Sequence, residues 1–301
     1  MLKIQKLHPL FGGRVQTKVN LHEGLSAEMV EDIEQAMAQY AVLVLPEQNI
    51  NDMEQIRFSR SFGPLELPPH MGMKVAAEQR IDPKLYDVTN LGLDGEILPP
   101  EALKHASNKA NQDFHSDSSF NGLPTKWSLL SARVIPPEGA DTHYIDTRAV
   151  YDALPDTMKA KVIDAVAEHS FWKTRTKSGY KPDQKMLDSM PPTRQKIETI
   201  CPRTGRKGLL IGEHITHIVG WDAQESNAFI EELYDFAAQP DFIYTHKWQQ
   251  GDLIIWNNPC TLHRATSFEV FKYKRDMRRA TINKFGPEIS STDFLKISAP
   301  K

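Results

Sequence analysis

Two distant stretches of the sequence carry residues with the types and spacing of metal ligands. In NQDFHSDSSF, residues 111–120, His115 and Asp117 lie two positions apart. In a β-strand, side chains two positions apart point to the same face, so the imidazole and the carboxylate would converge. Far downstream, GDLIIWNNPCTLHR presents His263 just after an apolar stretch. Two histidines and one carboxylate form the facial triad of non-haem iron(II) oxygenases, although zinc accepts similar ligands.

Two arginines near the C-terminus help to distinguish these metals. Arg275 and Arg279 lie four positions apart in FKYKRDMRRATI, so they share one face and stand about 13 Å apart if the segment is a strand. Guanidinium groups bind carboxylates bidentately, so each arginine could hold one carboxylate near the metal. The alternative is a solvated basic face, which fits Lys272, Lys274 and Arg278. A zinc hydrolase would have no use for two inward arginines. An iron enzyme that uses a 2-oxo acid would need them to bind carboxylates.

The pattern of apolar residues predicts a mainly β fold with flanking helices. Helices are expected at residues 26–40, with Ser26 as N-cap, and from Asn51, which forms a capping box with Glu54. The apolar stretch 41–46 is typical of a buried strand. Further strands are expected at 126–135, 142–147, 207–218, 241–248, 251–258 and 277–285, and a short helix at 148–154, capped by Asp146 or Thr147. Many short strands with helices outside them indicate a double-stranded β-helix, or jelly roll.

Two segments interrupt this pattern, and we expect them to be lid-like insertions in one domain that spans residues 1–301. Residues 66–110 are rich in Pro and Gly and too long for a simple connection, so we expect a functional loop. Residues 171–207 contain ten Lys or Arg and three Asp or Glu. This basic segment is either a solvated loop or a lid that attracts an anionic substrate. Nucleic-acid binding is a weaker alternative, because the whole chain has a formal net charge of −3.

The composition is typical of an ordinary globular protein. Hydrophobic residues make up 40% of the 301 residues and charged residues 25%. We expect neither a signal peptide nor a membrane span, because no apolar stretch has the required length. The two cysteines, Cys201 and Cys260, form no Cys-x-x-Cys motif. Reduced thiols and a cytoplasmic location are therefore expected.

Taken together, the motifs resemble the taurine/2,4-D dioxygenase family, and most closely its 2,4-dichlorophenoxyacetate branch. The resemblance spans about residues 40–285 and rests on FHSDSSF, SLLSARVIPPEGADT, RAVYDALP, GLLIGEHITHI, GDLIIWNNPCTLHR and RRATI. It implies a jelly-roll enzyme that uses Fe(II), O₂ and 2-oxoglutarate to hydroxylate a small molecule with a carboxylate or sulfonate group. For this branch the expected substrate is an aryloxyalkanoic acid such as 2,4-D, with ether cleavage to a phenol.

The resemblance also assigns roles by position to the residues of the metal and 2-oxoglutarate sites. His115, Asp117 and His263 fall on the iron ligands. Thr142 falls on the threonine that hydrogen-bonds the distal carboxylate of 2-oxoglutarate. Arg275 falls on the arginine that pairs with the same carboxylate.

Further positions fall near the 2-oxoglutarate or the substrate. Trp256 lines the 2-oxoglutarate region in relatives, although a core tryptophan is an equally good account of it. Arg279 falls on the arginine near the bound substrate acid. His70, His214 and His217 are candidates to border the substrate, and each could equally be a structural histidine.

Two departures from the family pattern leave alternatives open. Phe114 stands where the phenoxyacetate enzymes carry a tryptophan before the first iron ligand. The span from His263 to Arg275 is one residue longer than the family leads us to expect, so Lys274 is an alternative anchor for 2-oxoglutarate. Phe114 and Phe120 alternate with the two ligands of the expected strand, so both should point away from the ligand face.

Other functions use the same residues. The same chemistry on a sulfonate or an amino-acid-like substrate would keep the iron and 2-oxoglutarate sites unchanged. A non-catalytic jelly-roll protein that senses 2-oxoglutarate or an aromatic acid would share the fold. For the enzyme, we expect a homo-oligomer whose partner is a small anionic substrate, with no nucleic acid and no membrane.

Overall fold

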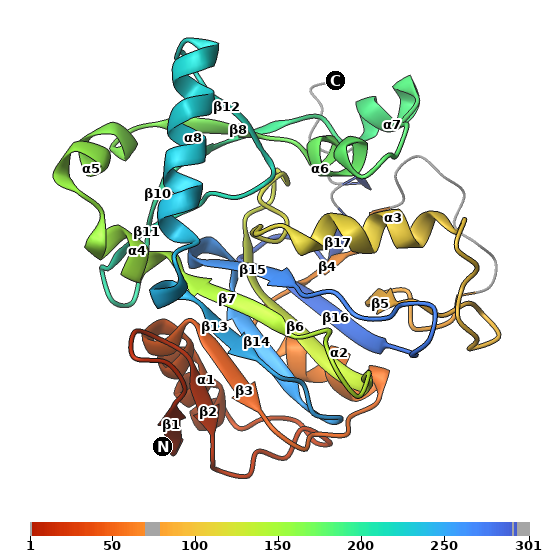
Figure 1. Cartoon of the computed structure of the whole chain (residues 1–301). Helices are drawn as coiled ribbons and strands as arrows, with labels where there is room; N and C mark the ends of the chain where they lie inside the picture. Colours follow the sequence, from red (N-terminus) through yellow and green to blue (C-terminus); the bar gives the residue numbers. More distant parts are fainter. Residues whose placement is uncertain (1, 70–78, 291, 294–301) are drawn as a thin grey trace.

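A nine-stranded sheet forms the base of the molecule in the computed structural model, which describes residues 2–69, 79–290 and 292–293 (Figure 1). The strand order is β1-β2-β3-β14-β6-β16-β4-β17, and β5 also pairs with β16. These strands are β1 (Ile4–Lys6), β2 (Gly13–Val15), β3 (Val42–Leu45), β4 (Leu65–Leu67), β5 (Tyr86–Thr89), β6 (Thr125–Val134), β14 (Leu253–Asn257), β16 (Asp276–Asn283) and β17 (Ile289–Ser290).

Three smaller sheets complete the β structure. One has the order β13-β7-β15 and shares an apolar cluster with the large sheet. The others have the orders β12-β8-β9 and β10-β11. Their strands are β7 (Thr142–Asp146), β8 (Val166–His169), β9 (Thr193–Lys196), β10 (Glu198–Ile200), β11 (Lys207–Leu209), β12 (Ile215–Ile218), β13 (Tyr244–His246) and β15 (Thr261–Ala265). This arrangement is the expected jelly roll with flanking helices.

Strand β14 shows how the central strands are buried on both faces. Leu253 and Ile255 belong to the apolar cluster on the helix side of the large sheet. Ile254 and Trp256 belong to the cluster between this sheet and β13-β7-β15. Successive side chains of a strand point to opposite faces, so a strand covered on both sides reads as a continuous apolar run. That is why residues 41–46 and 251–258 were recognisable as strands.

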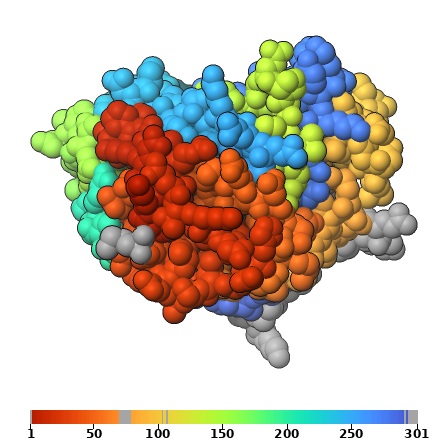
Figure 2. Space-filling view, turned by 90° about the horizontal axis from the view of Figure 1, so that it is seen from below, coloured from red at the N-terminus to blue at the C-terminus, as the bar shows by residue number. Residues whose placement is uncertain are grey.

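Helices cover the outer sides of the sheets. Helix α1 (Ala27–Tyr40) begins at Ser26, and α2 (Asp52–Arg60) begins with the predicted capping box of Asn51 and Glu54. Both helices contribute to the cluster on the large sheet, and Figure 2 shows the N-terminal part of the chain (red to orange) gathered over one face of the molecule. On the other side, a second cluster packs α4 (Thr147–Ala153), α5 (Asp156–Val162) and α8 (Ala223–Ala237) against β8, β11 and β12.

The two insertions contain more regular structure than the sequence predicted. The loop expected at 66–110 includes β5, and α3 (Leu103–Lys109) leads from it into η1 (Ala110–Gln112). The segment 171–207 includes α6 (Phe171–Lys177), α7 (Gln184–Ser189), β9 and β10. The expectation of a long loop at 66–110 was therefore wrong in part, and the segment 171–207 is not a continuous loop either, while the lid-like role of both segments stays a prediction. The short 3₁₀ helices are η1, η2 (Pro240–Phe242) and η3 (Asn258–Cys260).

The strand predicted at 207–218 is interrupted. Residues 210–214 separate β11 from β12, and Gly212 there has φ +129°. A Cβ at Gly212 would lie 3.0 Å from the Cα of His115, so a glycine lets the two backbones approach.

The described helices include none that is long and apolar enough to traverse a lipid bilayer.

Candidate metal centre

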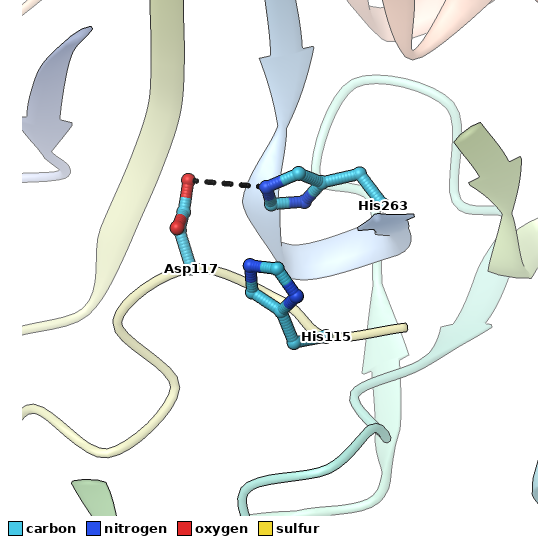
Figure 3. A group of neighbouring side chains, drawn as sticks. All are labelled: His115, Asp117 and His263. Atoms are coloured by element: carbon cyan, nitrogen blue, oxygen red, sulfur yellow. Dashed lines mark ion pairs between the residues drawn. The ribbon is translucent and has the colours of Figure 1, made fainter. Parts of the chain in front are cut away.

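His115, Asp117 and His263 converge at one buried point (Figure 3). One ligand atom from each side chain lies within 4.8 Å of the other two. All three residues are buried, with exposed fractions of 5 to 7%. The structure therefore brings together the three residues that the sequence named as metal ligands, although they come from segments almost 150 positions apart.

A single β-bridge and a turn position these side chains, rather than the predicted continuous strand. His115 and His263 form an isolated antiparallel bridge, in which each backbone N–H donates to the other residue's carbonyl at 3.1 and 2.9 Å. Asp117 already lies in a turn, and Ser118 after it has φ +57°. The expectation of a strand through both ligands was wrong, because only His115 finds a backbone partner there.

The two imidazoles are oriented in different ways. His115 Nδ1 donates to the carbonyl of Asp113 at 2.8 Å, which leaves Nε2 to face the centre. The ring of His263 packs against Trp256 at 4.7 Å and stacks with Tyr144 at 6.1 Å between centroids. A hydrogen bond fixes the first ring, whereas aromatic packing fixes the second.

The protonation states suit a divalent metal ion. Burial lowers the pKa of His115, and burial together with His115 lowers the pKa of His263 to about 3. Burial alone would raise the pKa of Asp117, but the charge of Arg279, the two neighbouring histidines and the hydrogen bond from Ser128 together lower it. Neutral imidazoles and an ionised carboxylate are the forms that bind metals. Asp117 Oδ2 and His263 Nε2 are 3.7 Å apart, too far for a hydrogen bond, and this spacing suits an ion between them.

One cavity of about 390 Å³ opens beside the centre, and we call it the Arg275 cavity. Its lining includes His115, His263, Thr142 and Trp256 as well as Arg275. The guanidinium of Arg275 is buried, and burial lowers its pKa to about 10. Within the part of the chain that the structure describes, no carboxylate forms an ion pair with it. A buried cation in an open cavity is a site for an anionic group.

The contacts of Arg275 and Lys274 differ, and the sequence left both open as the anchor for 2-oxoglutarate. Lys274 is 41% exposed and pairs with Glu96 at 2.8 Å, away from the cavity. Thr142 Oγ1 accepts a hydrogen bond from Trp248 Nε1 at 2.9 Å, so the threonine proton can be donated into the cavity. The extra residue after His263 therefore leaves Arg275, and not Lys274, beside Thr142.

A second cavity of about 320 Å³ lies on the other side of the centre, and we call it the Phe120 cavity. It shares a wall with the Arg275 cavity, and this common wall consists of Val88, Asn108, Asn111, His115 and Arg279. Phe120 and Phe171 give it aromatic surface, with ring centroids 5.1 Å apart. The two cavities therefore meet at the candidate ligand His115.

Arg279 stands at the boundary between the cavities. Its Nη1 donates a charge-assisted hydrogen bond to Asp117 Oδ1, and its guanidinium lies 4.4 Å from the ring centroid of Tyr86. The hydroxyl groups of Tyr86 and Ser118 both donate to Glu66 Oε1, and burial raises the pKa of this glutamate. The arginine expected to meet the substrate acid is thus held in place by Asp117 and Tyr86.

The histidines named as substrate candidates differ in their positions. His214 lines the Phe120 cavity and packs against Phe120 at 4.7 Å. His217 is 44% exposed and contacts Thr216 and Glu168, so the structure does not bring it to the site, and its assignment was wrong. A register shift between Ile215 and His217 breaks the strand alternation, so His217 does not share the buried face of Ile215. His70 lies outside the described residues.

The turn after Asp117 also changes the roles of the two phenylalanines. Phe114 is 1% exposed and packs into the cluster beside α8, away from both cavities, as predicted. Phe120 was expected to point away from the ligands as well, but it lines the second cavity. That expectation was wrong because the alternation of a strand ends at Asp117.

Sequence reasoning missed several residues of the site. Ser128, on β6, donates to Asp117 Oδ2 at 2.8 Å, and Glu66 and Tyr86 support Arg279. Nothing in the sequence marks these three, because their role depends on contacts between distant segments. Arg175 also lines the Phe120 cavity, and its only signal was its place in the basic segment 171–207.

A buried cluster of two histidines and one carboxylate inside a jelly roll is a group of side chains that could hold a single metal ion. The chain matches the family model described as "Taurine catabolism dioxygenase TauD, TfdA family" over residues 3–281. The protein belongs to this family of dioxygenases.

Three comparisons illustrate the relationship. The chain is 38% identical over 282 residues to the alpha-ketoglutarate-dependent 2,4-dichlorophenoxyacetate dioxygenase of Cupriavidus pinatubonensis, which covers 91% of this chain and 95% of the relative. It is 35% identical over 249 residues to the (S)-phenoxypropionate/alpha-ketoglutarate-dioxygenase of Sphingobium herbicidovorans, and the match covers 79% of this chain and 81% of that relative. Among solved structures, AAD-2 in complex with Mn(II) and N-oxalylglycine superposes with a TM-score of 0.85 at 36% identity, covering 96% of this chain and 99% of that one.

Proposed function

We propose that the protein uses Fe(II), O₂ and 2-oxoglutarate (alpha-ketoglutarate) to hydroxylate an aryloxyalkanoic acid such as 2,4-D. The observation that carries this proposal is the buried Arg275 guanidinium, which faces a cavity beside the metal centre without a carboxylate partner among the described residues. The named activities of the two enzyme relatives support the substrate class. The aromatic surface of the Phe120 cavity supports an aryl substrate.

Each of the central residues has a specific task in this reaction. His115, Asp117 and His263 would hold the iron, which, when bound, supplies O₂ activation coupled to decarboxylation of 2-oxoglutarate. Arg275 binds the distal carboxylate of 2-oxoglutarate as a charge-assisted pair, and the hydroxyl of Thr142 donates a further hydrogen bond to it. The buried Trp256 gives the co-substrate an apolar wall and keeps water away.

The substrate occupies the Phe120 cavity on the other side of His115. Arg279 provides a fixed guanidinium for the substrate acid, and Phe120 and Phe171 contact the aryl ring. This arrangement turns the carbon between the acid and the ether oxygen toward the metal centre. Hydroxylation of that carbon gives a hemiacetal, which collapses to a phenol and a 2-oxo acid.

Turnover measurements test the function. Phenoxyacetates and phenoxypropionates should stimulate 2-oxoglutarate consumption well above the uncoupled background, with one phenol released per turnover. A methyl ester in place of the acid should reduce kcat/KM at least tenfold, which is about 1.4 kcal/mol of transition-state binding. Taurine turning over faster than every aryloxy acid would refute the aryl substrate, and an ester as good as its acid would refute the role of Arg279.

The cellular setting is part of the proposal. We place the enzyme in the cytoplasm as a homo-oligomer, with a small anionic molecule and no nucleic acid as its partner. Cys201 and Cys260 are both free thiols, which supports a reducing compartment. Cell fractionation and light scattering of the purified protein test these two statements.

A further inference from the structure

One face of helix α6 is directed toward the Phe120 cavity. Phe171, Thr174 and Arg175 all line this cavity, and their spacing of three and four positions puts them on one side of the helix. Lys177, on the same helix, instead pairs with Asp113 and Glu213 and is 57% exposed. The basic segment 171–207 thus contributes a particular cation to the cavity, while its other charges lie outside.

Packing and electrostatics show where the Arg175 guanidinium lies. It stands over the ring of Phe171 at 4.9 Å from the centroid, which restricts the plane of the fork. Burial, and then the positive charge of Arg279, lower the pKa of Arg175 to about 10. Arg175 therefore presents its guanidinium to the Phe120 cavity in a restricted orientation.

Two like charges next to one cavity favour an anion between them. Arg279 already donates to Asp117, so much of its charge is balanced by the candidate metal ligand. Asp117 also acts on Arg175, but burial and Arg279 outweigh that effect. A substrate acid would relieve the repulsion between Arg175 and Arg279. It would also supply, in addition to Asp117, an acceptor for their guanidinium N–H groups.

We propose that Arg175 is a specificity-determining residue, which binds the acid group of the substrate together with Arg279. This inference rests on the proposed function, because it concerns the substrate of the same site. It makes α6 the part of the basic segment that contacts the substrate directly. It also predicts a preference for a carboxylate or sulfonate, whose several oxygens can accept from two guanidinium groups at once.

A pair of variants tests the role of Arg175. Arg175→Gln removes the cavity cation, and Arg194→Gln removes an exposed cation from β9 of the same basic segment. Binding of phenoxyacetate to the anaerobic enzyme with Fe(II) and 2-oxoglutarate is measured through the change in its visible charge-transfer band, and KM values are measured in air. We expect Arg175→Gln to weaken phenoxyacetate binding and raise its KM about ten- to a hundredfold. The KM for 2-oxoglutarate should stay within about twofold in both variants.

Each outcome has a distinct meaning. Equal phenoxyacetate binding by Arg175→Gln and Arg194→Gln overturns the role of Arg175 but leaves the proposed function standing. If the unaltered enzyme binds taurine or another acid instead of phenoxyacetate, the proposed substrate class fails, and the same variant pair tested with that acid decides the role of Arg175. Failure to bind any acid overturns both. Arg175→Lys should restore part of the affinity, since an ammonium keeps the charge but loses the planar fork.

Discussion

The two cavities on either side of His115 are built by different means. The Arg275 cavity takes Leu130, Thr142, Trp256 and His263 from strands β6, β7, β14 and β15. The Phe120 cavity takes most of its distinctive wall from the turn after Asp117, from α6 and from the segment around β4 and β5. Backbone ladders hold the first set of side chains in register. In the second set they hold only the residues of β4 and β5, whereas the turn and α6 contribute side chains that lie outside any sheet.

This difference matches two tasks: binding a 2-oxo acid, which is the same in every relative, and binding a substrate, which varies. Every turnover of such an enzyme needs the same 2-oxo acid, so a rigid wall of core strands suits the Arg275 cavity. Substrates differ between relatives, and irregular segments can change without disturbing a sheet. The shared wall at His115 and Arg279 is where the two tasks meet, so variants there should affect both cavities.

The largest effect is expected at the centre that the two cavities share. His115→Ala or Asp117→Ala removes one of the candidate ligands, so the charge-transfer band of the anaerobic enzyme with Fe(II) and 2-oxoglutarate should disappear, together with turnover. His217→Ala, which removes an exposed histidine from β12, is the matched control and should retain both. A band that persists without His115, or equal activity with Zn(II), would contradict the metal assignment.

The next effect should be confined to the Arg275 cavity. Arg275→Gln removes the buried guanidinium, and the loss of a charge-assisted contact should raise the KM for 2-oxoglutarate about ten- to a hundredfold. The KM for the aryloxy acid should change little. Lys274→Gln is the control, because Lys274 pairs with Glu96 at the surface. If only Lys274→Gln raises the KM for 2-oxoglutarate, the register of this segment is one residue off.

A smaller effect should be confined to the Phe120 cavity. Phe120→Leu keeps an apolar side chain but loses the edge-on contacts with Phe171 and His214. We expect the KM for phenoxyacetate to rise about two- to tenfold, as for the loss of an aromatic pair. The KM for 2-oxoglutarate serves as the internal control. A variant that raises both KM values equally would show that the two cavities are not independent.

The smallest effect concerns stability in acid. His169, on β8, is fully buried, contacts Ser119 Oγ at 3.0 Å, and has its pKa lowered to about 4 by burial and by Lys173. In the unfolded chain, His169 takes up a proton once the pH falls below its ordinary pKa of about 6.5, whereas in the folded protein it stays neutral down to about pH 4. The folded state therefore loses stability as the pH falls from about 6.5 to about 4.

Denaturant unfolding at about pH 7.5 and about pH 5.5 checks this expectation. The loss of unfolding free energy between the two pH values should be about 1 kcal/mol smaller in His169→Asn than in the unaltered protein. His217→Asn, at an exposed position, should show the full loss. Hydrogen exchange should report the acid effect first around residues 118–121, in the wall of the Phe120 cavity, and later in β7. An equal acid dependence in all three proteins would remove His169 from the explanation.

Sequence alone determined the parts of the protein that depend on local pattern. The capping box of Asn51 and Glu54 and the apolar runs of β3 and β14 specify their own secondary structure. The candidate ligands His115, Asp117 and His263 could be named from the sequence, because the side-chain types needed for this chemistry are few and their order along the chain is distinctive.

Tertiary structure alone decided what depends on contacts between distant segments. The turn after Asp117 brought Phe120 into a cavity, Gly212 let the β11–β12 connection approach His115, and α6 carried Arg175 to the Phe120 cavity. Local patterns predict helices and strands because short-range hydrogen bonds and burial periodicity define them. No such periodicity encodes which turns and short helices meet across a cavity, since their positions follow from packing of the whole chain.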